Sequence, residues 1–176
     1  MALKIAIQSV ETPDGLFSVV VADDAVVASG WGQDIDRILA QLPSSLGPLV
    51  DDGDDPPALS GVVAAVEAYY DGDFAALDAV PVRQFGTAFQ LAVWQKLREV
   101  PAGATVTYGE LARRAGYPLA ARAVGSVMAQ NAVPLIVPCH RVVRADGTIG
   151  QFGFGAELKR ALLLREGATL SGGVRS

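Results

Sequence analysis

Cysteine and histidine are almost missing from this chain of 176 residues, which contains one of each. A single cysteine excludes an internal disulfide, and a thiol that has to stay reduced predicts a cytoplasmic location. One cysteine and one histidine are also too few for the usual Cys/His zinc site, so we expect no metal and no cofactor. Any reaction centre that uses these two residue types must be built on this one pair.

Long apolar runs are missing as well. No run reaches the roughly 18 to 20 residues needed to cross a bilayer. The first residues lack a basic segment followed by an apolar core, so we expect neither a membrane span nor a secretory signal. Hydrophobic residues nevertheless make up 51% of the chain, which predicts a well-packed globular protein of one large or two small domains.

Basic residues are scarce in the first half of the chain. Residues 1–80 hold two of them, Lys4 and Arg37, against 14 acidic residues, a balance of −12. Residues 81–176 hold 12 basic and five acidic residues, a balance of +7, and the two halves sum to the net charge of −5. Such asymmetry of charge indicates that the second half binds a polyanion. An acidic half that only keeps the protein soluble would give the same count.

The first half has the pattern of short strands, predicted at 4–8, 16–21 and 25–28 and separated by turn signals. Helices are predicted at 36–42 and 59–70, with a polar loop at 51–57 between them. These elements predict a small N-terminal domain of sheet and helices. We place its border where the charge balance changes sign, which gives domains 1–80 and 81–176.

The second half is predicted to be mostly helical. Thr87 to Gln90 and Thr107 to Glu110 both fit the capping box that starts a helix. The second of these helices is short and ends near residue 115. A turn at 116–118 follows, with Pro118 suited to the start of the next helix, predicted over 119–130. A short helix, a three-residue turn and a second helix indicate a helix-turn-helix, although many helical hairpins bind nothing.

The lone cysteine and the lone histidine are adjacent, in the string Pro138-Cys139-His140-Arg141-Val142-Val143. A thiolate is a strong nucleophile, and an imidazole can take its proton. An isolated cysteine more often packs as a small hydrophobic residue. Neighbours on an extended segment point to opposite sides, so we do not expect Cys139 and His140 to form a direct pair.

From about residue 86 to 167 the chain resembles the DNA repair alkyltransferases, the methylated-DNA–protein-cysteine methyltransferases. The similar residues occur in the family's order and spacing. They are Gly86 to Gln90, Val93-Trp94, Thr107-Tyr108, Ala120 to Gly125, Asn131, Pro138 to Val143 and Glu166-Gly167. The resemblance implies an α/β (α+β) fold, with a ribonuclease-H-like first domain by analogy and a helix-turn-helix in the second. It implies irreversible, single-turnover transfer of an alkyl group to Cys139 from oxygen-6 of guanine, and from oxygen-4 of thymine, in double-stranded DNA by a monomer.

The resemblance also implies a role for each site residue. Cys139 is the alkyl acceptor, His140 its base through a bridging water, and Glu166 the group that holds the far side of the imidazole. Asn131 ties the recognition helix to the active-site turn, and Tyr108 helps rotate the target nucleotide and hydrogen-bonds the base. The remaining implied residues are Arg122, which fills the gap left by the flipped base, Gly109 and Tyr117 toward DNA, and Val142, Phe152 and Gly153 in the guanine pocket.

The chain departs from the family pattern after the active site. The family usually carries a tyrosine and then a serine or arginine before a glycine pair, whereas this chain has Gln151-Phe152-Gly153-Phe154-Gly155. Two other functions fit parts of the sequence. One is a non-catalytic, lesion-binding module, against which Cys139 argues. The other is a cysteine hydrolase, which would need an oxyanion hole for which the sequence gives no signal.

Overall fold

The computed structural model describes residues 2–170, which form two compact units. The first unit runs to Phe85 and also takes in Ala132–Ile136, and the second consists of the rest. The main segment of the first unit ends at Phe85, five residues beyond the domain limit at 80 and within the stretch 78–86 where the charge balance changes sign. Residues 81–83 still pair with the first unit's sheet, and Ala132 accepts a hydrogen bond from the Ser29 N–H at 2.9 Å.

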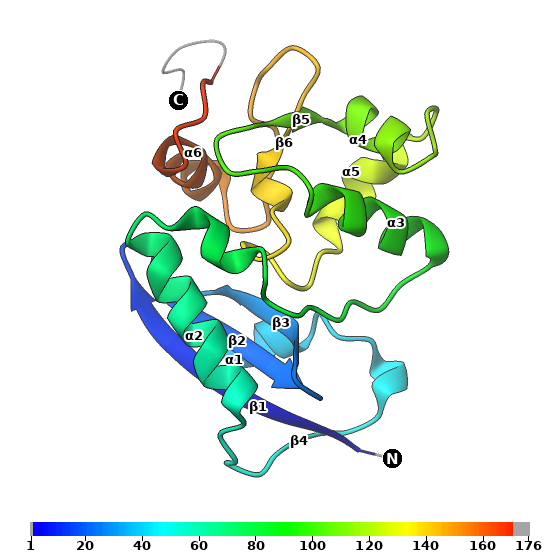
Figure 1. Ribbon diagram of the computed structural model, residues 1–176. Coiled ribbons are helices and arrows are strands. Elements are labelled where there is room, and N and C mark those ends of the chain that lie inside the picture. The colour runs from blue at the N-terminus through cyan, green and yellow to red at the C-terminus, as the bar shows by residue number, and fades with distance from the viewer. Residues whose placement is uncertain (1, 171–176) are drawn as a thin grey trace. The chain divides into compact units, whose positions relative to one another are not determined.

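The first unit is built on a four-stranded sheet in the order β3-β2-β1-β4 (Figure 1). Its strands are β1 (Leu3–Thr12), β2 (Gly15–Ala22), β3 (Ala25–Trp31) and β4 (Leu49–Asp51). The first three pair antiparallel, as their turn signals predict, and β4 pairs parallel with β1. Asp23 and Asp24 make the β2–β3 turn with φ of 48° and 66°, a conformation that aspartate tolerates. Strand β4 was not predicted, and its last residue falls in the expected polar loop.

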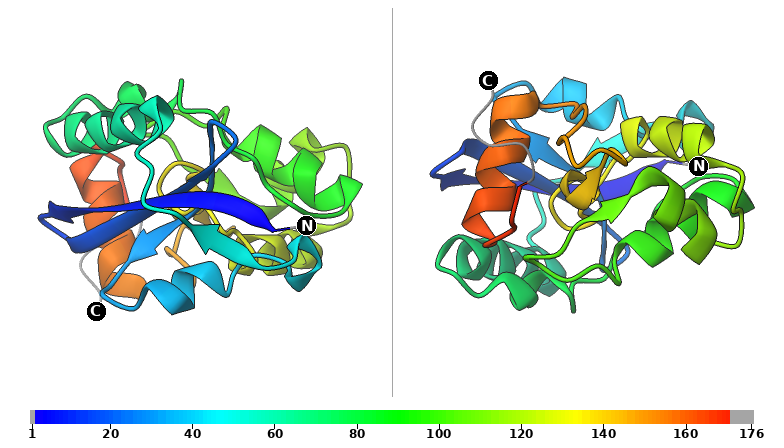
Figure 2. Two further views of the ribbon diagram at one scale, coloured as in Figure 1. Left: turned by 90° about the horizontal axis from the view of Figure 1, so that it is seen from below. Right: turned by 90° about the horizontal axis from the view of Figure 1, so that it is seen from above.

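Two helices cover opposite faces of this sheet, as the left view of Figure 2 shows. Helix α1 (Ile35–Leu39) is shorter than the predicted 36–42, and Ile38 and Leu42 pack against Ile5 and Val20. Helix α2 (Pro57–Tyr70) confirms the helix predicted at 59–70. With 14 residues it is the longest helix described, and no helix in residues 2–170 is long and apolar enough to cross a membrane.

The second unit is mostly helical. Its elements are α3 (Ala88–Leu97), β5 (Val106–Thr107), α4 (Tyr108–Arg114), α5 (Ala121–Ala129), the 3-10 turn η3 (Cys139–Arg141), β6 (Val142–Val143) and α6 (Ala156–Arg165). The capping box of α3 is confirmed, because the Thr87 hydroxyl accepts from the Gln90 N–H and the Gln90 side chain accepts from the Thr87 N–H. At α4, the Thr107 hydroxyl accepts from the Glu110 N–H at 3.1 Å.

Helices α4 and α5 form the predicted helical hairpin, but the connection is longer than three residues. The prediction that Pro118 starts the second helix is wrong, since α5 begins at Ala121. The Ala120 N–H donates to the Tyr117 carbonyl at 3.0 Å, which closes a β-turn with Pro118 in its second position. The fixed φ of proline suits that position of a turn.

A short parallel pair positions the site. Val106 pairs with Val142 and Thr107 with Val143. Tyr108 follows Thr107 directly, and Cys139 lies three residues before Val142. The pairing of β5 with β6 therefore brings the start of α4 to the cysteine turn.

Candidate active site

Cys139 lies on a tight turn and not on an extended segment, so the predicted extended backbone is wrong. The Arg141 N–H donates to the Pro138 carbonyl at 2.9 Å, and this i to i+3 bond closes the 3-10 turn η3. The Cys139 N–H donates to the Val137 carbonyl at 2.8 Å. The turn holds the thiol in place with only 8% of the residue exposed.

Opposing influences act on the Cys139 thiol. Burial raises the pKa of Cys139, whereas a hydrogen bond from the Asn131 side chain and the charge of Lys159 lower it. The backbone N–H groups of Cys139 and His140 also lower it. Asn131 is fixed for this contact because its Nδ2 donates to the Val137 carbonyl at 2.9 Å. The resting thiol keeps its proton, but the groups around it favour the thiolate once a base removes that proton.

His140 is completely buried and contacts a carboxylate. Its Nε2 lies 2.8 Å from Glu166 Oε2. Burial lowers the pKa of His140, so the ring is neutral, and a carboxylate neighbour requires the proton on Nε2. The other ring nitrogen, Nδ1, is then a proton acceptor, and within residues 2–170 it has no hydrogen-bond partner. An imidazole with a free Nδ1 beside a cysteine has the electronic form of a general base.

Glu166 is held by Arg141 as well as by His140. Arg141 donates from Nε to Oε1 at 2.8 Å and from Nη2 to Oε2 at 3.0 Å, and its Nη1 donates to the Val100 carbonyl at 2.7 Å. Burial alone would raise the pKa of Glu166, but the hydrogen bonds from His140 and Arg141 outweigh it and lower the pKa to about 2. The carboxylate therefore stays ionised and fixes the histidine tautomer.

The end of α6 explains how a helix-end glutamate becomes buried. Glu166 is the C-cap residue, and Gly167 takes φ of 79°, which ends the helix directly after it. Lys159, Leu162, Leu163 and Glu166 are spaced so that they share one face of the helix, and all four are buried. Read from the sequence alone, Glu166 would be a solvated charge.

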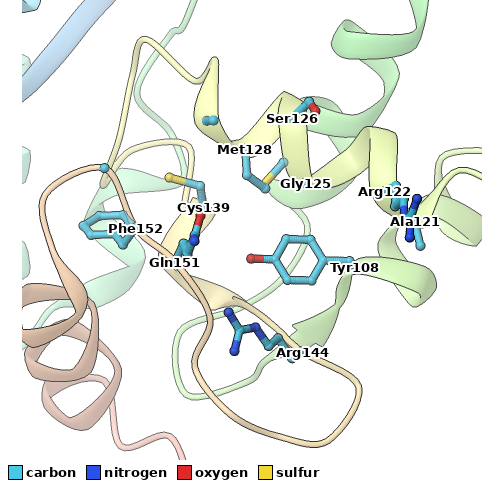
Figure 3. Close-up of a pocket in the computed structure, with 12 residues that line it drawn as sticks. Tyr108, Ala121, Arg122, Gly125, Ser126, Met128, Cys139, Arg144, Gln151 and Phe152 are labelled. Atoms are coloured by element: carbon cyan, nitrogen blue, oxygen red, sulfur yellow. The ribbon is translucent and has the colours of Figure 1, made fainter. Parts of the chain in front are cut away.

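A cavity of about 750 Å³ opens at Cys139 (Figure 3). Its lining includes five of the residues expected at the site, namely Tyr108, Arg122, Cys139, Phe152 and Gly153. The Tyr108 ring lies across the cavity with its hydroxyl directed toward the side of Cys139 and Phe152 (Figure 3). Burial raises the pKa of Tyr108, so the phenol keeps its proton and can donate a hydrogen bond.

Six expected residues are absent from the described lining of this cavity. Asn131, His140 and Glu166 make the contacts described above, and three others remain. Val142 is fully buried on β6. Gly109 follows Tyr108 in α4. Tyr117 is exposed and packs edge-on against Phe89, with ring centroids 4.7 Å apart. Their predicted roles stay predictions.

Sequence reasoning missed three cationic residues of the site. Arg141 is part of the string Pro138 to Val143, but the resemblance implies no role for it. Lys159 carried a usable signal, since it shares the helical face of Leu162 and Leu163, where a lysine is unusual. Arg144 lines the cavity, and the sequence around it gives no signal for that.

Residues 88–168 match the family profile described as 6-O-methylguanine DNA methyltransferase, DNA binding domain. Proteins named methylated-DNA–protein-cysteine methyltransferase are similar to the chain. The one from Haemophilus influenzae is 44% identical over 113 residues, 64% of this chain and 63% of that protein. The one from Mycobacterium bovis is 46% identical over 109 residues, 62% of this chain and 66% of that protein. The matched part thus spans just under two thirds of the length of these relatives.

The similarity to solved structures covers more of the chain than the similarity to these proteins does. The crystal structure of Mycobacterium tuberculosis O6-methylguanine methyltransferase matches 93% of each chain at 32% identity, with a TM-score of 0.73. The chain belongs to the 6-O-methylguanine DNA methyltransferase family. The Mycobacterium tuberculosis protein in complex with DNA matches 91% of this chain and 92% of that one at 33% identity, again with a TM-score of 0.73. The α+β fold expected from the resemblance is confirmed. The methyltransferase profile covers the stretch from Cys139 to Glu166.

Proposed function

We propose that this methyltransferase-family chain repairs double-stranded DNA by direct reversal, as a monomer in the cytoplasm. It moves an alkyl group, such as methyl, from oxygen-6 of guanine, and from oxygen-4 of thymine, to Sγ of Cys139. The observation that carries the proposal is the single thiol of the chain, which lies at a cavity and is adjacent in sequence to a buried imidazole. A carboxylate holds this imidazole, and its Nδ1 has no hydrogen-bond partner within residues 2–170. The similarity to methylated-DNA–protein-cysteine methyltransferases supports the same reaction.

The reaction balances without a cofactor. The bond between the alkyl carbon and the base oxygen breaks as the bond from that carbon to sulfur forms. The thiol proton passes to His140 Nδ1 through a bridging water. The guanine ring takes up one proton from solvent as it regains its normal form, and His140 releases its extra proton to solvent. Tyr108 can donate a hydrogen bond to the base as negative charge develops on it. The thioether product has no leaving group that the site could activate, so each molecule reacts once.

The target base has to leave the helix, because Cys139 is buried in the lining of a cavity and cannot reach a base that stays within the duplex. Arg122 stands at the first turn of α5, exposed and lining the same cavity as Cys139. It is the only charged side chain of α5, a helix rich in small residues, and we assign it to the space that the base leaves. The surplus of basic residues in the second half supplies phosphate contacts.

Intact-mass measurement separates this function from its alternatives. The protein is incubated with a duplex that contains one O6-methylguanine and is then weighed, with Cys139→Ala as the control. A gain of one methyl per wild-type molecule and none in the control is the expected result. DNA binding without a gain would favour the lesion-binding module. Turnover of an ester substrate with no lasting gain would favour the hydrolase.

A further inference from the structure

Lys159 is a buried cation that the proposed reaction leaves without a role. Its exposed fraction is 0%, although it is a lysine in the middle of α6. Its Nζ donates to the Val142 carbonyl at 2.7 Å and to the Gln151 carbonyl at 3.2 Å. No ion pair in the described part of the chain includes it. A charge kept out of water without a carboxylate partner is costly, so a structural role alone explains it poorly.

The two carbonyls that Lys159 binds belong to two different segments of the chain, one that follows the cysteine turn and one that leads into the cavity lining. Val142 directly follows the cysteine turn, on β6. Gln151 begins the stretch in which Gln151, Phe152 and Gly153 line the cavity. One ammonium group therefore joins the backbone that follows the cysteine turn to the segment that lines the cavity. We call this segment, residues 150–153, the wall.

The wall passes close to Tyr108 at Gly150 and is within ordinary contact distance of Lys159 there. Gly150 has φ of 74°, and a Cβ there would lie 3.1 Å from the Tyr108 hydroxyl and 3.6 Å from Lys159 Nζ. Glycine suits this position, because its φ is one that residues with a side chain rarely adopt and because a Cβ would press on the Tyr108 hydroxyl. The position of the wall thus depends on contacts made at Gly150 and Gln151.

The charged and titratable groups around the ammonium are few. Burial lowers the pKa of Lys159, Cys139 raises it and Arg144 lowers it further, so that the pKa lies at about 8. The charge of Lys159 in turn lowers the pKa of Cys139 and that of His140. The Cys139 thiolate is the anion that this cation can stabilise.

We propose that Lys159 is a positioning residue with two linked effects: its ammonium holds the wall at 150–153 against Val142, and its charge favours the Cys139 thiolate. The consequence for repair rests on the proposed function, whereas both effects can be measured without DNA. Because Cys139 is the only thiol, labelling by iodoacetamide reports on this one sulfur, and intact mass gives the rate.

The test compares Lys159→Met, which keeps the length of the side chain without donors or charge, with Lys159→Gln, which keeps a donor, and Lys159→Arg, which keeps the charge. Lys96→Met is the matched control, since Lys96 is an exposed lysine paired with Glu99. In Lys159→Met we expect the labelling profile to move up by about one pH unit, hence about tenfold slower labelling at neutral pH. We also expect faster hydrogen exchange in 150–155 with unchanged exchange in α3. Lys159→Arg should regain the labelling profile more fully than Lys159→Gln.

A Lys159→Met protein with the labelling profile and loop exchange of wild type would overturn the proposal. If that variant does not fold, Lys159→Gln decides by the same measurements, since loss of the charge alone must slow labelling. Exchange that rises equally in α3 and in 150–155 would show a general loss of stability and would also refute a positioning role. Failure of the proposed function would appear instead as wild-type protein that labels normally and gains no methyl from DNA.

Discussion

Replacing Glu166 by glutamine removes one negative charge from the buried site while keeping the volume. In the folded wild-type protein, the pKa of the Glu166 carboxyl is lowered from its ordinary value of 4.5 to about 2. That difference of about 2.5 corresponds to about 3 kcal/mol, at about 1.4 kcal/mol for each unit. A group with a lowered folded-state pKa stabilises the protein above its unfolded pKa, and the contribution is lost as the pH falls toward the folded value. Glu166 therefore contributes fully at neutral pH and progressively less from about pH 4.5 down to pH 2.

We expect the free energy of unfolding of Glu166→Gln at pH 7, measured by urea denaturation, to be about 3 kcal/mol lower than that of wild type. The difference should shrink as the pH is lowered from 5 to 3. The control Glu99→Gln breaks an exposed pair with Lys96 and should change stability by less than about 1 kcal/mol. Methyl transfer should slow about 100-fold while DNA binding is kept, because the histidine loses its fixed tautomer.

Three results would each refute a part of this reasoning. Wild-type stability in Glu166→Gln at pH 7 would show that the buried charge contributes nothing. A stability difference that stays constant from pH 5 to pH 3 would show that the loss comes from packing and not from ionisation. Equal losses of transfer rate and DNA affinity would remove Glu166 from the proton relay.

Three further changes test other parts of the site. Arg122→Ala should slow repair of duplex DNA more than reaction with free alkylguanine base, because only the duplex has to be opened; equal losses would refute the gap-filling role. DNA affinity measured across a salt series should fall as salt rises, and a flat series would contradict the charge argument. Phe152→Tyr combined with Gly153→Ser should raise the rate with methylguanine relative to benzylguanine, since a hydroxyl near the base adds a hydrogen bond worth about 1 to 3 kcal/mol. A Cβ at Gly153 meets nothing within 4 Å, so the serine fits, and an unchanged rate ratio would mean that the loop backbone alone sets the preference.

Local signals in the sequence predicted local structure well. The capping hydroxyls of Thr87 and Thr107 start α3 and α4 as expected, because a cap acts within one helical turn. The adjacency of Cys139 and His140 located the candidate site. The shape of their turn could not be read from the sequence, because it depends on the hydrogen bond from the Arg141 N–H to the Pro138 carbonyl.

Contacts between residues far apart in the chain were not predictable. The Ser29 hydroxyl donates to the Pro134 carbonyl across 105 positions, and with the Ser29 N–H it draws the segment before the cysteine turn into the first unit. The helical spacing of α6 places Lys159 on a buried face, but nothing in the sequence indicates that it binds the carbonyls of Val142 and Gln151. Pairings of this kind depend on the whole fold and leave no periodic trace in either segment.

The burial that keeps the Cys139 proton in place also bears on how long an unused molecule lasts. Peroxides and small electrophiles attack thiolates, and a buried thiol with a raised pKa offers them little thiolate. A protein that reacts once cannot recover from oxidation to a sulfinic acid any more than from alkylation. In the proposed function, the low resting reactivity of the sulfur preserves the stock of competent molecules between lesions, and the reactive form arises only when the base and the substrate act on it together.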